Sequence, residues 1–384
     1  MTGGGSGGHI TPLLSLAHAL KKTRPDCRIV YIGHKGDRFD RLEERYHDFD
    51  DVAFVSAGKF RRYAGRSWLS RGRDIRTLLL NARDFFRVFG STAAAYKILH
   101  KVKPSVVFSK GGFVALPVGI AAKIRDVPIV THDSDALPGL ANRIIGRWAV
   151  VHATAMPANF YSYPSETVRQ VGIPIDERVR RVTSLDQERF KRQLGLDSSS
   201  LVLLVAGGGL GSQSVNDKVL AIAPELLAAN AKLHIVHIAG QNNKDQVSRV
   251  YAERLDDKAA KRVMVLGFSG EFYREVGAAD LIIARAGATS LAEFAAAAKP
   301  VIVIPSPFLT GGHQLKNAEQ LQKAAAVEVV DDEAPAKILL SKVSQLIKNP
   351  EKRHELAVKL GATAQPDAAD KLAEIVLDVA AQKV

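Results

Sequence analysis

The sequence contains almost no cysteine and no long apolar run, and both shortages narrow the possible classes of protein. Its single cysteine, Cys27, excludes an internal disulfide, and no group of Cys and His residues has the spacing of a zinc site. No apolar run is long enough to span a bilayer, and the N-terminus lacks the pattern of a secretory signal. We therefore expect a cytoplasmic protein whose contact with any membrane is peripheral.

Acidic residues are outnumbered, and the excess of basic residues is concentrated in one segment. The chain of 384 residues has 53 Lys and Arg against 40 Asp and Glu, a formal net charge of +13. Between Lys59 and Lys103, twelve basic residues stand against only Asp74 and Asp84, and large apolar side chains are interleaved with them. This mixture is typical of a segment that binds an anionic membrane surface. Nucleic-acid binding is an alternative that no helix-turn-helix, zinc-finger or ribonucleoprotein motif supports. The second alternative is that the segment forms an ordinary amphipathic helix whose basic face is solvated.

Short apolar runs alternate with helical patterns, which predicts an α/β protein with parallel sheets and crossover helices. The length fits two domains. We place the linker at 172–174 and expect terminal helices broken near Pro350 and Pro366. The expected strands are 28–32, 52–56, 105–109, 128–131, 149–153 and 168–171 in the first half and 201–206, 233–239, 263–266, 281–284, 301–304 and 326–330 in the second.

Two glycine-rich turns, each followed by a helical pattern, indicate where ligands bind. They are Gly3–His9 and Gly207–Gln213. Glycines let the backbone approach a ligand closely, and the N-terminus of the following helix attracts phosphate. A lone turn of this kind is as often a plain strand-to-helix connection, but two copies favour two α/β halves facing one cleft. Only Met1 and Thr2 precede the first turn, where a doubly wound domain has a strand, so we expect that strand to be missing from this sequence.

Seven groups of short motifs are spread in order over nearly the whole chain. They are Gly4–His9, Lys110–Val114, His132–Asp135 with Gly139–Asn142, Gly172–Pro174, Gly207–Asn216, Arg285–Ser290 with Glu293, and His313–Ala318. Each motif is weak alone, but together they resemble the MurG family of bacterial glycosyltransferases (family 28). Members of that family transfer N-acetylglucosamine from UDP-GlcNAc to lipid I, the undecaprenyl-pyrophosphoryl muramyl-pentapeptide, with inversion at the anomeric centre, and so form lipid II for peptidoglycan.

The resemblance implies the GT-B architecture of two Rossmann-like, doubly wound parallel-sheet domains facing a cleft. Residues 1–172 would bind the acceptor and the membrane, 173–364 would bind the UDP-sugar, and 365–384 would form a helix that packs back on the first domain. The implied partners are UDP-GlcNAc, the lipid-linked acceptor, the anionic inner leaflet of the cell membrane and cell-wall synthesis proteins, with no nucleic acid. The alternatives are a GT-B enzyme that glycosylates another lipid, a sugar-nucleotide epimerase, and a non-catalytic homologue that binds UDP-sugar or lipid.

Three residues of the first half are candidates for the base that deprotonates the acceptor hydroxyl. His9 is favoured because imidazole titrates near neutrality, although a helix cap or a phosphate contact would also explain it. Asp133 and Asp135 are rival bases, unless they cap the helix that begins near Pro138. The resemblance implies that the acceptor and its diphosphate contact Ser6, Gly7, Gly8, Gly111, Gly112 and Asn142.

In the second half, one carboxylate and one helix start suit the donor. Glu293 can accept two hydroxyl hydrogen bonds, so we expect it to bind the uridine ribose, as the corresponding Glu does in the family. Gln314 and Asn317 suit the sugar hydroxyls, with solvated surface amides as the alternative. The donor site is completed by the N–H groups of Ala288, Thr289 and Ser290 at the diphosphate and by Gly208, Gly209 and His313. No carboxylate pair has metal spacing, so we expect neither metal nor cofactor.

Three departures from the family's pattern distinguish this chain. Residues 132–135 read His-Asp-Ser-Asp where the family usually has His-Glu-Gln-Asn, which makes the acceptor pocket more acidic. Asp176 stands where the family has an Arg that would contact the donor phosphates. Gly209–Leu210 replaces Ser-Gln in the second glycine turn. A changed donor or acceptor is the expectation that these departures raise.

Overall fold

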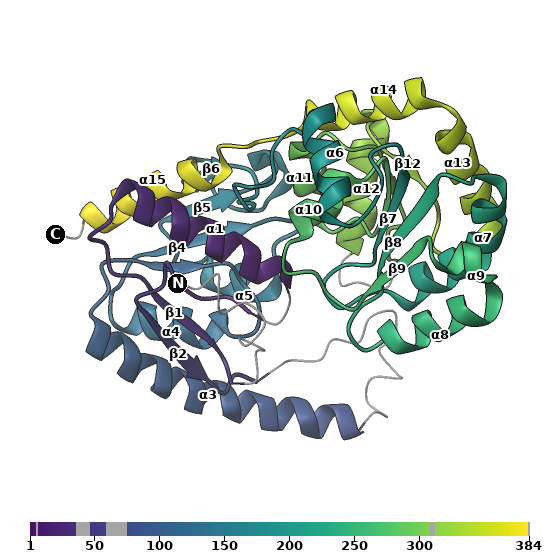
Figure 1. The fold of residues 1–384 in the computed structure, drawn as a ribbon. Helices are drawn as coiled ribbons and strands as arrows, with labels where there is room; N and C mark the ends of the chain where they lie inside the picture. The colour runs from purple at the N-terminus through teal and green to yellow at the C-terminus, as the bar shows by residue number, and fades with distance from the viewer. Residues whose placement is uncertain (5–6, 36–46, 59–74, 308–311, 383–384) are drawn as a thin grey trace. The chain divides into compact units, whose positions relative to one another are not determined.

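Parallel strands joined by helices build one sheet region in each of two units of the chain, seen in a computed structural model (Figure 1). The structure describes residues 1–4, 7–35, 47–58, 75–307 and 312–382. The first unit contains Met1–Ile175, Phe308–His313 and Asp367–Val384, and the second contains Asp176–Pro307 and Gln314–Pro366. The boundary after Ile175 directly follows the Gly172–Pro174 motif.

The first unit has two groups of parallel strands, ordered β1-β2 and β3-β4-β5-β6. The strands are β1 (Val30–His34), β2 (Asp51–Val55), β3 (Val107–Ser109), β4 (Ile129–Asp133), β5 (Val151–Thr154) and β6 (Val168–Gln170). The helices are α1 (Gly7–Thr23), α3 (Ile75–Val102), α4 (Ala115–Ile124), α5 (Leu140–Ile145) and α15 (Ala368–Ala381), with short 3₁₀ turns at Ala158–Phe160 and Ser165–Thr167.

Helices cover both faces of this first sheet because successive strand residues point to opposite faces. Phe108 and Val130 pack with α1 and α15, and the neighbouring residues Val107 and Ile129 pack with α3 and α4. Helices α1 and α15, from opposite ends of the chain, lie side by side (Figure 1). The carboxyl ends of the strands are thereby left for the loops that carry the sequence motifs.

Met1 and Thr2 occupy the centre of the first sheet. Thr2 bridges Ile32 of β1 and Ser109 of β3, donating its N–H to Phe108 O at 2.9 Å. Next to Met1, a cavity of about 540 Å³ lies between β1 and β3. Its lining comes from both faces of the sheet and includes Leu20, Val376, Ile98 and Val118. One bridging residue therefore holds the position that a doubly wound sheet gives to its first strand.

The second unit has a six-stranded parallel sheet with the order β12-β11-β10-β7-β8-β9. The strands are β7 (Leu201–Ala206), β8 (Leu233–Ile238), β9 (Val263–Leu266), β10 (Leu281–Ala284), β11 (Val301–Val303) and β12 (Glu328–Val329). The helices are α6 (Ser184–Gln193), α7 (Gln213–Ala229), α8 (Lys244–Arg254), α9 (Asp257–Ala260), α10 (Phe272–Ala278), α11 (Ala288–Ala296), α12 (His313–Lys323), α13 (Ala336–Lys348) and α14 (Pro350–Gly361).

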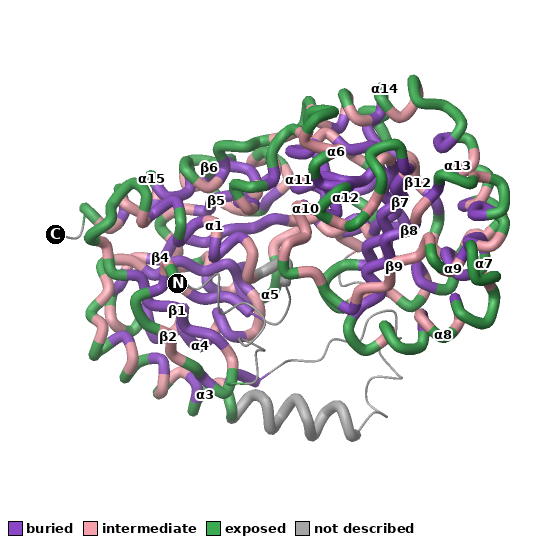
Figure 2. The backbone as a smooth tube through the Cα atoms, viewed as in Figure 1, coloured by how far each residue is buried: buried purple, intermediate pink, exposed green. Residues whose placement is uncertain are grey.

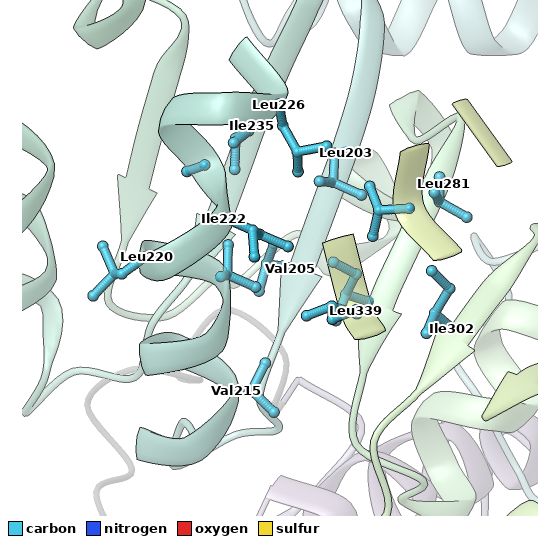
Figure 3. Close-up of a cluster of buried hydrophobic side chains, with 14 of the residues drawn as sticks. Leu203, Val205, Val215, Leu220, Ile222, Leu226, Ile235, Leu281, Ile302 and Leu339 are labelled. Carbon is cyan, nitrogen blue, oxygen red and sulfur yellow. The ribbon is translucent and has the colours of Figure 1, made fainter. Parts of the chain in front are cut away.

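The central strands of this sheet are nearly continuous apolar runs because both of their faces are covered. Leu203 and Val205 of β7 are fully buried, as Figure 2 shows for the strand as a whole. Figure 3 shows these two side chains packed with Leu226 of α7 and Leu339 of α13. Burial of each large aliphatic side chain stabilises the fold by about 1.5–3 kcal/mol.

All twelve strands predicted from the sequence are confirmed, with β12 shorter than expected at Glu328–Val329. The predicted breaks between the terminal helices are confirmed as well. Pro350 takes the first position of α14, where its missing N–H costs nothing, and the Asn349 side chain accepts the Lys352 N–H at 2.9 Å. Pro366 lies between α14 and α15.

Candidate functional site

The first glycine turn and the turn after β3 meet at the carboxyl edge of the first sheet. Gly111 and Gly112 have φ of +90° and +83°, where a side chain would be strained. A Cβ on Gly112 would lie 2.6 Å from Gly4 O, so only glycine permits this approach. Gly7, Gly8 and His9 form the first turn of α1, whereas Ser6 and the side chain of His9 lie outside the described part of the chain.

Asp133 ends β4 at this same edge and is held by three donors. Its Oδ1 accepts from Asn142 Nδ2 and its Oδ2 from the Tyr163 hydroxyl, both at 3.0 Å, and it also accepts the Gly139 N–H. Burial raises the pKa of Asp133, and these donors together with the charge of Lys110 oppose that rise. Gly139 is the N-cap of α5, so neither Asp133 nor Asp135 is the N-cap residue.

Asn142 uses its whole side-chain amide to join three elements. Its Nδ2 donates to His132 O at 2.9 Å as well as to Asp133, and its Oδ1 accepts from Ser109 Oγ at 3.0 Å. The side chain is almost fully buried. Asn142 therefore fixes the ends of β3 and β4 against α5. If Asn142 orients the acceptor, it does so by holding these strand ends in place.

Two residues at this edge were not expected from the sequence. Lys110 is only 4% exposed and lies within electrostatic range of Asp133 and Asp135. The Tyr163 ring stacks on His152 at 3.7 Å between centroids and 3° between planes. The lysine directly before two glycines in the sequence could have indicated a site residue. The sequence around Tyr163 contains no such indication, because Tyr163 contacts Asp133 from 30 positions along the chain.

In the second unit, the second glycine turn is fixed by close backbone contact. Gly208 and Gly211 have φ of +90° and +78°, and a Cβ on Gly211 would lie 2.1 Å from Ala239 O. Ser212 then begins α7 by accepting the Val215 N–H at 3.4 Å. Leu210 is 77% exposed at the tip of this turn. Gly209 and Leu210 are thus presented on a turn that only glycines at its hinges allow.

Arg285, at the end of β10, ties four strand ends together. Its Nε donates to Ser212 Oγ at 2.9 Å, and its Nη1 donates to Ile304 O at 2.9 Å and to Asp332 Oδ1 at 2.7 Å. The Ser214 hydroxyl donates to the same Asp332 oxygen at 2.6 Å. Both members of the ion pair are mostly buried, at 11% and 6% side-chain exposure. The network holds the second glycine turn against β10, β11 and the residues after β12.

The candidate donor residues gather around the starts of α11 and α12. Ala288, Thr289 and Ser290 form the first turn of α11, whose N–H groups point out of the start of the helix, and Glu293 one turn later is 8% exposed. His313 begins α12.

The two amides of α12 are held inside the second unit. Gln314 accepts the Ser306 N–H at 2.9 Å, and Asn317 donates to Ala286 O at 3.2 Å. Both are buried, so the alternative of solvated surface amides is wrong.

Asp176 replaces the Arg of the family's pattern, but another cation, Arg178, lies beside it. Its two carboxylate oxygens accept from Arg178 Nε at 2.9 Å and Nη2 at 2.7 Å, and the Arg178 guanidinium lies 4.4 Å from the Tyr273 ring centre.

The described residues contain no group of three or more His, Cys, Asp or Glu able to hold a metal ion. Among the helices of the described ranges, none is long and apolar enough to cross a bilayer.

Comparison with known proteins agrees with this arrangement. Residues 1–153 match the N-terminal domain of glycosyltransferase family 28, and residues 202–372 match its C-terminal domain. A relative from Halothermothrix orenii, named UDP-N-acetylglucosamine–N-acetylmuramyl-(pentapeptide) pyrophosphoryl-undecaprenol N-acetylglucosamine transferase, is 32% identical over 99% of this chain and 98% of its own. The relative of the same name from Clostridium kluyveri is 34% identical over 98% of both chains.

Solved structures show the same fold. The crystal structure of Acinetobacter baumannii MurG matches with a TM-score of 0.69 at 23% identity over 98% of both chains. A UDP-GlcNAc 2-epimerase from Neisseria meningitidis, bound to UDP-GlcNAc, matches with a TM-score of 0.68 at 13% identity over 95% of this chain and 96% of its own.

Two parallel-sheet units, each with a glycine turn before a helix, have the GT-B architecture, and the two family matches identify the class of protein as a glycosyltransferase. The full-length identity to named transferases narrows the class further. This chain belongs to glycosyltransferase family 28.

Proposed function

We propose that this enzyme transfers N-acetylglucosamine from UDP-GlcNAc to the undecaprenyl-pyrophosphoryl muramyl-pentapeptide, the step of peptidoglycan synthesis that forms lipid II. The observation that carries the proposal is identity above 30% over nearly the full length to relatives named for that transfer. The turn after β3 and the second glycine turn both contain glycines with positive φ, a backbone geometry that lets a ligand approach closely. Through lipid II the enzyme would serve cell shape and division.

The donor is proposed to bind at the starts of α11 and α12. N–H groups of Ala288–Ser290 and the positive end of the α11 dipole neutralise the leaving diphosphate, which replaces the metal ion that other transferases use. Glu293 accepts the ribose hydroxyls, while Gln314 and Asn317 direct their amides to the sugar. Gly208 and Gly209 let the backbone come close to the same ligand.

The acceptor is proposed to bind at the carboxyl edge of the first sheet, where His9 is the base. Asn142, Tyr163 and the Gly139 N–H hold the Asp133 carboxylate in place, while burial raises its pKa. Asp133 and Asp135 are both carboxylate rivals of His9. The base removes the proton of the attacking hydroxyl in a single inverting displacement, with no covalent enzyme intermediate.

Turnover of UDP-GlcNAc with a lipid I analogue tests the function. We expect a disaccharide-bearing lipid product and free UDP, and we expect His9→Ala to lower turnover by about 10² to 10⁴ while UDP still binds. Conversion of UDP-GlcNAc without any acceptor would instead identify an epimerase, and UDP-sugar binding without turnover would identify a non-catalytic homologue. Either result would overturn the proposed transfer.

The Lys59–Lys103 segment is proposed to hold the enzyme at the cytoplasmic face of the membrane, where its acceptor lies. Residues 59–74 of the segment lie outside the described ranges, and most of the remainder belongs to α3. Surface attraction to anionic lipid is screened within about 8 Å at physiological salt, so vesicle binding should fall as salt rises.

Serine at Arg71, Arg73 and Arg76 should weaken vesicle binding and activity on lipid-embedded acceptor, but spare activity on a soluble analogue. The matched control removes three exposed basic residues of the second unit, Lys244, Arg249 and Lys258. Equal losses on both acceptors would contradict membrane docking by this segment.

A further inference from the structure

A chain of buried polar side chains runs from α8 to the second glycine turn. Asn216 of α7 and His237 of β8 are fully buried, and Tyr251 of α8 is 4% exposed. His237 contacts both of the others, with its Nε2 3.0 Å from Asn216 Oδ1 and its Nδ1 2.9 Å from the Tyr251 hydroxyl oxygen. Asn216 in turn donates from Nδ2 to Ala239 O at 3.0 Å. Three elements of the second unit are therefore linked by polar contacts inside its core.

The direction of each hydrogen bond in this chain follows from its last member. A backbone carbonyl can only accept, so Asn216 presents its amide nitrogen to Ala239 O and its Oδ1 to His237. The Nε2 of His237 therefore carries the hydrogen, and its Nδ1 accepts from the Tyr251 hydroxyl. Burial lowers the pKa of His237 to about 4, which keeps the imidazole neutral. All of the hydrogen bonds thus point one way, from Tyr251 toward Ala239 O.

Ala239 O is also the atom against which the second glycine turn packs. A Cβ on Gly211 would lie 2.1 Å from this oxygen, and a Cβ on Gly240 would lie 2.5 Å from Leu210 O. Gly211 and Gly240 have φ of +78° and +92°, and they meet with no side chain between them. The position of the turn therefore depends on the position of the Ala239 carbonyl.

Two anchors hold the turn in place. On the side of β10, Arg285 donates to Ser212 Oγ at 2.9 Å. On the side of β8, the Ala239 carbonyl accepts from Asn216 and also from Asn243 Nδ2 at 3.1 Å. The Asn216 amide is itself kept in one orientation by His237, which prevents it from rotating away from the carbonyl. The anchor at β8 therefore extends back to the imidazole in the core.

We infer that His237 is a positioning residue for the donor sugar nucleotide, because through Asn216 and Ala239 O it holds the second glycine turn in the conformation that binds the donor. The inference rests on the proposed function, in which Gly208 and Gly209 of that turn approach UDP-GlcNAc. His237 is fully buried, so it acts through Asn216 and not by contact with the donor. A buried network that loses one member leaves polar groups unsatisfied, and the rearrangement that satisfies them moves the turn.

Two amide substitutions test this role, because each keeps one half of the hydrogen bonding of the imidazole. Glutamine places its amide near the position of Nε2 and can donate to Asn216, whereas asparagine reaches only the position of Nδ1 and leaves Asn216 without a donor. By calorimetry, His237→Gln should keep the Kd for UDP-GlcNAc within about threefold of wild type, and His237→Asn should raise it about 10-fold or more. In steady-state kinetics, His237→Asn should raise KM for the donor and leave KM for the lipid-linked acceptor unchanged.

The control variant is Leu227→Ala, which opens a cavity near the other end of α7. It should lower Tm by a similar or larger amount than His237→Asn, yet leave the Kd for UDP-GlcNAc unchanged. If Leu227→Ala weakens donor binding as much as His237→Asn does, or if His237→Gln binds the donor as weakly as His237→Asn, then His237 acts only through overall stability and the inference fails.

Amide hydrogen exchange without substrate separates this inference from the proposed function. His237→Asn should speed exchange of the Gly211 N–H, which bonds to Gly208 O at 2.9 Å, and His237→Gln should not. If wild type binds UDP-GlcNAc but transfers no sugar while these differences hold, the proposed transfer fails and the role of His237 stands. Faster exchange in His237→Asn with an unchanged Kd for UDP-GlcNAc would mean that the turn does not bind the donor, which overturns the inference.

Discussion

Replacing Asp332 by alanine should destabilise the second unit by about 3–5 kcal/mol, the usual cost of leaving a buried ion pair with one partner. The variant would leave the Arg285 guanidinium with its bonds to Ser212 and Ile304 but no counter-charge, at 11% side-chain exposure. It would also remove the acceptor of the Ser214 hydroxyl. Asp332→Asn keeps the shape and one acceptor oxygen, so its loss should be smaller.

Urea unfolding followed by circular dichroism measures the loss, with hydrogen exchange of β10 and β11 assigning it to the second unit. Glu319→Gln is the matched control, because Glu319 and its partner Lys323, 2.6 Å apart, are 54% and 66% exposed and their ion pair should contribute little to stability. Replacing both partners together, as Arg285→Met with Asp332→Leu, should recover much of the stability. If Asp332→Ala costs no more than Glu319→Gln, the network does not hold the glycine turn as argued.

Three further outcomes are expected. Glu293→Ala should raise the apparent KM for UDP-GlcNAc steeply, since two charge-assisted hydrogen bonds are worth about 3–6 kcal/mol, and unchanged donor affinity by calorimetry would remove Glu293 from the site. Tyr163→Phe keeps the ring that stacks on His152 but removes a hydrogen bond that lowers the pKa of Asp133, so that pKa, measured by ¹³C NMR, should rise further; Tyr161→Phe, which loses a hydroxyl bonded to the backbone of Asp135, should change it less. Burial lowers the pKa of three imidazoles from 6.5, and these are His132 to about 3 and His152 and His237 to about 4. Because the unfolded chain binds these protons more readily, Tm should fall as pH drops from about 6.5 to 4, and an unchanged Tm at pH 5 would contradict their burial.

The sequence was sufficient to predict the strands and the glycine turns because both depend on local pattern. Apolar runs such as 201–206 become central strands wherever helices cover both faces, and Gly111 or Gly211 is required by a backbone conformation that other residues avoid. Lys110 lay inside a recognised motif, but its burial depends on the neighbouring Gly3 and on β4, which no local pattern specifies.

The side-chain networks could not be predicted, because they depend on strand order and register. Arg285 and Asp332 are 47 positions apart and meet only because β10, β11 and β12 are neighbours in the sheet. Tyr163 reaches Asp133 across β5 in the same way. Nothing in the residues around Asp332 or Tyr163 indicates a partner at that distance.

The short bridge at the centre of the first sheet has a practical consequence for protein engineering. Thr2 donates its N–H to Phe108 O and its hydroxyl to Ile32 O, and its own carbonyl accepts the Lys110 N–H, so a single residue links β1 to β3. Proline at position 2 would remove the bond to Phe108 O, and a spectroscopic label there would have to fit inside the sheet. Labels on the first unit therefore belong on exposed helix positions such as Lys123 of α4, where they leave the bridge intact.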